Sequence, residues 1–400
     1  MDLRTNAYPA GPHHRHQSSL QGILQAETPV MEENTRAQAD ARMRHILQHC
    51  EAAASQQPRQ GYDRPALVRL THDYARSDDS KSLFLSSFFE HLDLPLAGNV
   101  TDPDVDFGDP EVKERLCKSV DAFAEYLMET LFFPLMVVSN KTPQPSPITN
   151  SAVQRAQGSD LPQTFVGTPE RVSALRGTCL VRDRHRCVIS RKFDINEGIK
   201  RYKAAPGNAR DDDGQLIMPD DCQTLEVAHI LPHSLNKASD SLLSPGKKAT
   251  LDILNMFDVG VVHMIEGVEI DRPHNAISLT QEHHRHFGAF RIFFHGPIES
   301  QPQHTYRVDA FDDFVRRALR LPVTRTLYLT ENRNIDPPSP RLLAIHRAIG
   351  HILHLSGAGD YIEQVLRDAE EYGVRSDGST QLGMLLSLKL NSVACIGVRS

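Results

Sequence analysis

The pattern of apolar and polar positions predicts helices in the first and last parts of the chain. Residues 32–57 and 64–92 have a helix-forming composition, and apolar residues at 110–133 recur every three or four positions, as a helix with one buried face requires. Near the C-terminus the same spacing continues to Leu355, and a second stripe follows the turn at Gly357–Gly359. Both ends of the chain are therefore expected to be helical.

The middle of the chain differs because short strands are predicted there as well as helices. A helix is expected at 171–183, followed by the β-prone segment 186–194 and a charged loop that ends near Asp221. The apolar run Leu225–Leu231 then predicts a short strand, which Pro232 ends.

Two helices and one strand are expected after that point. Residues 247–257 predict a helix with one apolar side, and a turn at Pro273–Asn275 leads into a strand. Thr280 precedes a polar helix and is its expected N-cap.

These elements predict an α+β fold in which a small mixed module is flanked by helical N-terminal and C-terminal regions. The expected parts are a disordered tail (1–35), a helical N-terminal region (36–139), a linker rich in Pro, Ser, Thr and Gln (140–169), a mixed domain (170–320) and a helical C-terminal region (321–400).

The composition of the chain bears on the cellular compartment in which the protein is expected. No apolar run reaches the roughly 18 residues that a membrane span needs, and the polar N-terminus lacks the apolar core of a secretory signal. The six cysteines form no CxxC pair, which argues against a disulfide framework and against a paired zinc knuckle. We therefore expect an intracellular protein, in the nucleus or the cytoplasm, that does not bind a membrane.

The charge is unevenly distributed. The net charge of −7 disfavours wide coverage by nucleic acid, yet Arg171–Arg210 holds 11 Lys and Arg against 3 acids, a local excess of +8 (11 − 3). Such a segment can neutralise phosphates, although a solvated basic face has the same composition.

Three polar residues of the middle part suggest chemistry at a phosphate. His229 lies in the predicted strand just before the bend at Pro232, Asn275 lies in the turn, and His284 lies one turn into the following helix. This order is a compact way to face two imidazoles across one phosphate, where a His can deprotonate water and one divalent cation can stabilise the developing charge. Imidazole and carboxylate donors suit Mg²⁺, Mn²⁺, Ni²⁺ or Zn²⁺, so the metal is not identified.

The segments around these residues resemble the HNH endonuclease family, and most closely the HNH domains of many fungal proteins. AHILP contains His229, DRPHNAISL contains Asn275, HHRHF contains His284, and RCVIS at 186–190 is similar to the hairpin that precedes them. The resemblance covers about residues 170–311 and implies a ββα-metal fold. It also implies that His229 is the general base, that Asn275 braces the loop that orients it, and that His284 binds the metal.

The resemblance leaves the second metal ligand open. Ala228 stands where many members have Asp or His, and Gly288 stands where many have Asp. Glu226 lies on the same strand face as Ala228, because side chains alternate along a strand, and is either the missing ligand or an exposed strand residue. His283 is adjacent to His284 but is turned by about 100° on a helix, and we favour His284.

Two hypotheses follow for the function. The first is a metal-dependent endonuclease that hydrolyses phosphodiester bonds of nucleic acid, with DNA favoured, and with Arg285, Arg291 and Arg186 in contact with it. The second is a catalytically inactive HNH-fold protein that binds nucleic acid or another protein, which Ala228, Gly288 and the acidic net charge favour. A zinc-stabilised DNA-binding module is less favoured because paired cysteines are missing.

Overall fold

The computed structural model describes residues 31–54, 61–139, 168–232, 235, 245–330 and 334–372. The expected tail and linker lie almost wholly outside these ranges, as does the end of the chain after Tyr372. Among the helices in these ranges, none combines the length and the apolar character that a membrane crossing requires.

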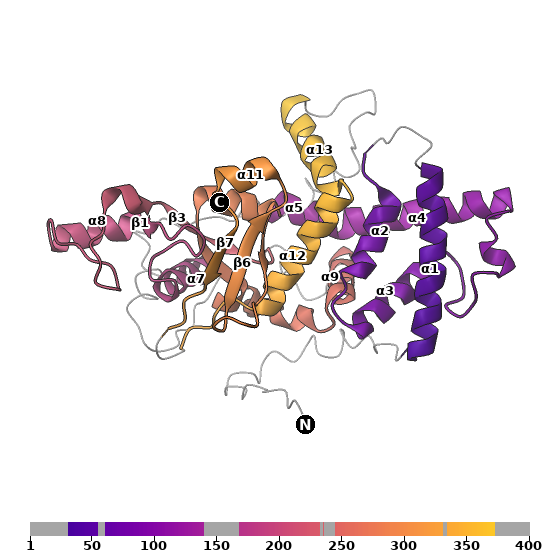
Figure 1. The fold of residues 1–400 in the computed structure, drawn as a ribbon, viewed down its shortest axis with the longest axis horizontal. Helices are drawn as coiled ribbons and strands as arrows, with labels where there is room; N and C mark the ends of the chain where they lie inside the picture. The colour runs from indigo at the N-terminus through magenta and orange to yellow at the C-terminus, as the bar shows by residue number, and fades with distance from the viewer. Residues whose placement is uncertain are drawn as a thin grey trace, which may run out of the picture.

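Helices build the N-terminal region (Figure 1). They are α1 (Glu33–Ala54), α2 (Arg64–Asp73), α3 (Asp78–His91), α4 (Pro110–Leu127) and α5 (Phe133–Ser139). The single helix expected at 64–92 is divided into two, because the Ser77 side chain accepts a hydrogen bond from the Ser80 amide and starts α3 as its N-cap. A π-helical turn, Met128–Phe132, joins α4 to α5.

The middle part alternates short strands and helices. Its elements are α7 (Thr168–Arg182), β1 (Phe193–Asp194), α8 (Ile195–Ala204), β2 (Cys222–Gln223), β3 (Leu225–His229), α9 (Pro245–Phe257), β4 (Ala276–Thr280) and α10 (Gln281–Gly288). β1 and β2 pair in parallel, and β3 and β4 pair antiparallel with His229 opposite Ala276. The expected strand at Leu225–Leu231 and the expected cap at Thr280 are confirmed, since the Thr280 side chain accepts from the His283 amide.

One expectation for this part is confirmed in part and another is wrong. Segment 186–194 forms strand only at its end, as β1, and Arg186 pairs with Phe193 across a tight turn in which Cys187 and Arg191 are joined by a backbone hydrogen bond and Arg191 takes a left-handed φ of 65°. The charged loop contains α8, which begins where the Asp194 side chain accepts from the Glu197 amide.

A second antiparallel sheet follows α10, in the order β5–β6–β7. Its strands are β5 (Ile292–His295), β6 (Thr305–Ala310) and β7 (Val323–Thr326), with α11 (Asp313–Ala318) between the last two. The region 321–400 was expected to be helical, but it starts with β7. The expected helices then follow as α12 (Pro340–Leu355) and α13 (Ala358–Tyr372). The chain is therefore α+β, with small sheets among many helices.

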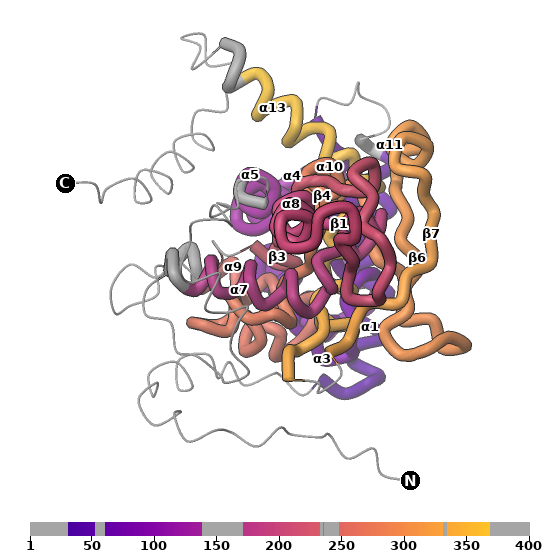
Figure 2. Tube along the Cα trace, turned by 90° about the vertical axis from the view of Figure 1, so that its left-hand side faces the viewer, coloured from indigo at the N-terminus to yellow at the C-terminus, as the bar shows by residue number. Residues whose placement is uncertain are grey.

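One hydrophobic core extends through the three regions. Its buried residues run from Ala39 in α1 to Ile362 in α13. α9 packs on α3, and α12 packs on both α2 and β5, so α12 lies between the N-terminal helices and the sheets (Figure 1). The end of the molecule that carries α8 and β1 faces the viewer in Figure 2. The helical flanks thus complete the core of the middle part.

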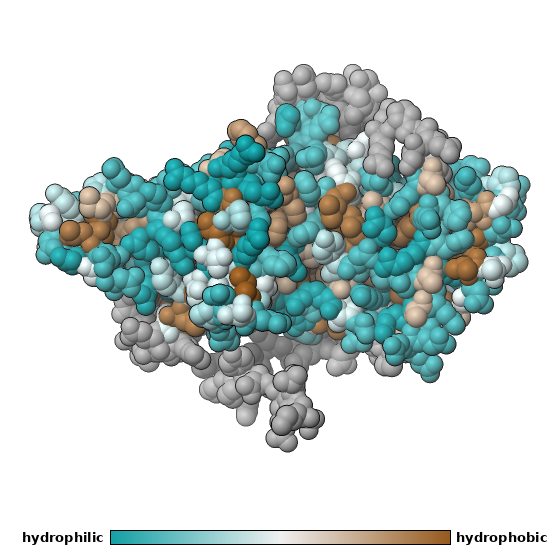
Figure 3. All heavy atoms as spheres, viewed as in Figure 1, coloured by the Kyte–Doolittle hydropathy of each residue, from teal (hydrophilic) through white to brown (hydrophobic). Residues whose placement is uncertain are grey.

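α8 projects at one end of the molecule and carries apolar side chains on its surface (Figure 3). Ile195, Ile199 and Tyr202 recur at helical spacing and are exposed, as are Leu216 and Met218 in the following loop. The α8 helix is therefore amphipathic with an open apolar face.

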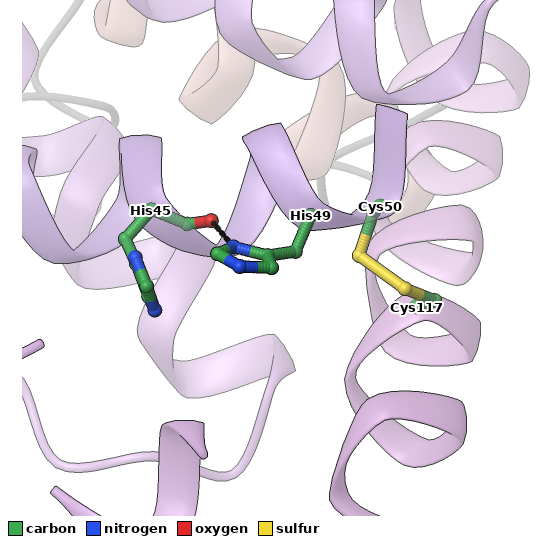
Figure 4. Close-up of a disulfide and its surroundings, with 4 residues drawn as sticks. All are labelled: His45, His49, Cys50 and Cys117. Atoms are coloured by element: carbon green, nitrogen blue, oxygen red, sulfur yellow. Dashed lines mark hydrogen bonds between the residues drawn. A yellow bond between two sulfur atoms is a disulfide. The ribbon is translucent and has the colours of Figure 1, made fainter. Parts of the chain in front are cut away.

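A disulfide joins Cys50 of α1 to Cys117 of α4 (Figure 4). The expectation of a chain without disulfides is wrong for this pair. Its two cysteines are 67 residues apart in the sequence and share no motif, so only the packing of α1 against α4 brings them together. Cys179, Cys187 and Cys222 are free thiols.

Candidate active site

His284 and Glu226 meet where α10 packs on β3. His284 Nδ1 lies 2.6 Å from Glu226 Oε2, and the Gln281 amide donates to the other carboxylate oxygen at 3.2 Å. The hydrogen bond from His284 lowers the pKa of the Glu226 carboxyl below its ordinary value. Because a carboxylate only accepts, Nδ1 of His284 carries the proton, and in the neutral ring Nε2 keeps the lone pair. The Glu226 side chain is 21% exposed, so the pair is reached from solvent.

His283 is turned away from this pair. Its Nδ1 lies 2.7 Å from the hydroxyl of Thr280, the residue that caps α10. Burial, reinforced by the charges of His286 and Arg325, lowers the pKa of His283 to about 4. Of the two adjacent histidines, it is His284 that reaches Glu226.

His229 pairs with a different carboxylate. Its Nε2 lies 3.2 Å from Oδ1 of Asp271, and Arg171 of α7 binds the other oxygen of Asp271, also at 3.2 Å. The side chains of His229 and Asp271 are only 2% and 1% exposed. Asp271 was not anticipated from the sequence, although it opens the DRPHN segment that contains Asn275.

The two imidazole–carboxylate pairs lie on opposite sides of β3. Glu226 and His229 are three residues apart, and side chains alternate along a strand, so their side chains point to opposite faces. Glu226 faces α10, whereas His229 is joined through Asp271 to Arg171 of α7. Three residues of strand span about 10 Å. The structure therefore holds His229 and His284 in separate pairs, and the expectation that the two imidazoles face each other across one site is wrong for the folded chain.

Asn275 is fully buried and ties together the segments on either side of His229. Its amide group donates to the carbonyls of Leu231 and Ile270, and its oxygen accepts from the Leu231 amide, all within 3.0 Å. Leu231 follows His229 by two residues, and Ile270 directly precedes Asp271. Asn275 thereby fixes the backbone next to both members of the His229–Asp271 pair.

A buried ion pair supports the same turn from α7. Arg182 binds Asp183 through two hydrogen bonds of 2.8 and 2.9 Å, and both side chains are fully buried. Arg182 also donates to the carbonyls of Pro273 and Ala276, which lie on either side of Asn275. Asp183 accepts from the Ser278 amide of β4. These additional hydrogen bonds offset the free-energy cost of removing the two charged groups from water.

The three arginines expected to contact nucleic acid differ in whether an acidic side chain pairs with them. Arg285 is exposed on α10 and has no ion pair in the described ranges. Arg186 forms an ion pair with Asp211, and Arg291 forms one with Glu363 of α13. Arg285 is therefore the one of the three whose charge is open to a phosphate.

Acidic residues that follow the basic segment neutralise much of its charge. Counted over residues 171–221 the excess is +3, because 11 basic residues face 8 acids. The ion pairs between the two stretches are Arg184–Asp213, Arg186–Asp211, Lys192–Asp221 and Arg201–Asp212. The local excess of +8 at 171–210 is therefore partly compensated in the folded chain, because the acidic loop folds back onto the segment.

Two side chains of this site are suitable donors for a metal. Glu226 and His284 supply a carboxylate and an imidazole that face each other, whereas Ala228 and Gly288 supply no donor. His, Cys, Asp and Glu form no potential metal-binding group of three or more within the part of the chain that the structure describes. Two protein donors fit a cation that keeps several of its waters, such as Mg²⁺, better than catalytic zinc, which takes three.

Comparison with known proteins relates this region to a family of enzymes. Residues 187–295 match the family model described as HNH endonuclease. No curated protein and no solved structure matches the chain. The matched segment contains β3, β4 and α10 with the two imidazole–carboxylate pairs, and it ends at the close of β5. This part of the chain is therefore similar to HNH endonucleases, which suggests nuclease activity on nucleic acid.

Proposed function

We propose that the protein is a metal-dependent endonuclease that hydrolyses phosphodiester bonds of DNA. The observation that carries the proposal is the Glu226–His284 pair, which is open to solvent and lies within the segment similar to HNH endonucleases. The elements β3, β4 and α10 would form the ββα-metal module. The nuclear or cytoplasmic location and the likeness to fungal HNH proteins stay predictions.

Glu226 and His284 would hold the divalent cation. His284 has a lone pair at Nε2 while Nδ1–H is bound by Glu226, an arrangement common in histidines that bind metals. Glu226 then acts as the orienting partner of His284, or it binds the metal directly. When bound, the cation stabilises the charge that develops on the phosphate and on the leaving oxygen.

His229 would be the general base. Asp271 accepts a hydrogen bond from Nε2–H of His229, so Nδ1 is the nitrogen that would take the proton from the attacking water. Asn275 fixes the backbone on both sides of this pair, and Arg285 would bind a phosphate next to the one that is attacked. Because His229 is enclosed, substrate binding has to open a path to its ring.

A protein that binds nucleic acid without cleaving it is the alternative. Two observations favour it: the His229 side chain is 2% exposed, and Ala228 leaves the metal with two protein donors. In this case the folded module would bind DNA, and neither histidine would be needed for binding.

The test is cleavage of supercoiled plasmid with Mg²⁺, Mn²⁺ or Ni²⁺. We expect wild type to nick or linearise the plasmid, and His229→Ala and His284→Ala to reduce the rate by about 100-fold or more. His263→Ala is the matched control, because the His263 side chain is 61% exposed. Intact plasmid with every metal, or equal cutting by both site variants, would contradict the proposal.

Substitutions of Glu226 distinguish its two possible roles. Glu226→Gln keeps an acceptor for His284 Nδ1–H but removes the charge, whereas Glu226→Ala removes both. If Glu226 orients His284, the Gln variant retains much more activity than the Ala variant. If Glu226 binds the metal, both variants lose activity alike, and more metal is needed to restore it.

A further inference from the structure

Two arginines cross between the turn at 187–192 and strand β7. Arg191 of the turn donates to the carbonyl of Thr326 at 2.6 Å, and Arg325 of β7 donates to the carbonyl of Ile189 in the turn, also at 2.6 Å. The guanidinium of Arg191 lies over the ring of Tyr328, 4.4 Å from its centroid. Both arginines are half-buried and held in place by backbone groups.

Neither arginine has an acidic partner among the described residues. Arg325 donates to a second carbonyl, that of Thr324, and Nη1 of Arg191 is buried with no hydrogen bond in the described ranges. Other arginines of the same region are neutralised, since Arg184 and Arg186 each bind an aspartate. Arg191 and Arg325 are thus a pair of positive charges without a compensating anion.

The two charges act on each other. Burial and, next to it, the charge of Arg191 lower the pKa of Arg325. An anion placed between the two guanidinium groups would remove this repulsion and satisfy the remaining donors, as arginines do for phosphates.

We propose that Arg191 and Arg325, beside Tyr328, form a binding site for a backbone phosphate of DNA. The inference rests on the proposed function for the identity of the ligand. The position fits a phosphate near the one that is cleaved, because the turn that carries Arg191 is joined to β4, the strand before α10, by a hydrogen bond of 2.9 Å from the Val188 amide to the Ser278 carbonyl. Tyr328 fixes Arg191 by a cation–π contact and keeps its guanidinium oriented.

The test is binding of a labelled DNA duplex, measured by fluorescence anisotropy in EDTA over a series of salt concentrations. We expect Arg191→Gln and Arg325→Gln each to weaken binding about tenfold, and each to reduce the slope of log affinity against log salt by about 1. Arg317→Gln is the matched control, because Arg317 is exposed on α11 and has no ion pair in the described ranges. Arg325→Lys keeps the charge, so the salt dependence of its DNA binding should equal that of wild type. This variant keeps the test valid if Arg325→Gln fails to fold.

The outcomes separate this inference from the nuclease proposal, because no metal or turnover is involved. If wild type cuts plasmid but both Gln variants bind DNA like Arg317→Gln, the phosphate site is refuted and the nuclease proposal stands. If wild type cuts nothing but both Gln variants lose affinity, the phosphate site is supported and the nuclease proposal fails. Inorganic phosphate is a second ligand in the test. It could raise the melting temperature of wild type but not of the two Gln variants, while the variants bind DNA as tightly as wild type. In that case the site binds a free anion, and the inference is wrong.

Discussion

At the scale of single residues, the candidate base His229 depends on a chain of buried contacts. Asp271 binds its Nε2, and Arg171 binds the other oxygen of Asp271. A buried carboxylate needs such a positive partner, because the loss of hydration is otherwise uncompensated. The carboxylate in turn selects the tautomer of His229 with the proton on Nε2.

Asp271→Asn is expected to slow cleavage by at least about tenfold while leaving the fold intact. An amide at this position can present its NH₂ group to the ring and so favour the wrong tautomer of His229. The measurement is the cleavage rate, with the ¹⁵N chemical shifts of the His229 ring reporting the tautomer. Asp360→Asn, at an exposed position of α13, is the control. An unchanged rate together with an unchanged tautomer would show that Asp271 does not position the base.

Sequence reasoning identified His229, Asn275 and His284 because each lies in a short motif with a defined order. The sequence did not reveal that Asp271 is the partner of His229, because the two residues are 42 positions apart. It also did not reveal the contact between Arg325 and Ile189, which are 136 positions apart. Such partners are chosen by packing, and a single sequence does not record which distant residues pack together.

At the scale of elements, α10 carries His284 and is held at both ends. Thr280 caps its start, and His346 of α12 lies 3.0 Å from the carbonyl of Phe287 at its end. The His346 ring stacks on Phe287 at 3.9 Å and on Phe290 at 4.5 Å. The C-terminal helix α12 therefore determines where α10 lies on β3 and β4.

His346 should make the stability of the protein fall in acid. Its burial lowers the pKa of the imidazole to about 3, so the folded protein keeps this ring neutral while the unfolded chain titrates at about 6.5. The stabilisation is fully present above about pH 6.5 and is lost as the pH falls towards 3, by up to about 1.4 kcal/mol per pH unit. Urea unfolding at pH 7.5, 5.5 and 4.5 measures how the free energy of unfolding changes with pH.

His346→Leu is the variant that tests the assignment. It should be less stable than wild type at pH 7.5, because the Phe287 carbonyl loses its donor, but its stability should depend less on pH below 6.5. Equal slopes for wild type and variant would mean that other groups cause the acid sensitivity.

At the scale of the whole molecule, the HNH-like segment is not a separate unit. α9 comes from this segment and packs on α3 of the N-terminal region, and α12 from the C-terminal region packs on α2 and β5. The core is continuous across these contacts. A fragment limited to residues 187–295 would expose the apolar faces that the flanking helices cover.

Reduction of the Cys50–Cys117 disulfide is expected to destabilise the N-terminal helices. Cross-linking residues 67 positions apart restricts the unfolded chain and stabilises the fold by roughly 4 kcal/mol. The melting temperature should fall by several degrees on addition of a reductant, and the double variant Cys50→Ser, Cys117→Ser should melt at this lower temperature without reductant. Cys222→Ser, which removes a free thiol, is the control. The disulfide would be disproved if an alkylating agent labelled all six cysteines of the unreduced, denatured protein.

The sequence by itself determined the local features of this protein. It specified most of the helices, the strand with His229, the capped helix with His284 and the α+β class, because periodicity, caps and turns act over a few residues. The tertiary structure alone decided which charges are neutralised and which carboxylate each histidine meets. It brought the aspartates of the following loop onto the basic segment and left Arg191 and Arg325 without an acidic partner in the described ranges. It also placed His229 and Glu226 on opposite faces of β3. These outcomes depend on contacts between residues far apart in the chain, where burial and geometry outweigh local preference.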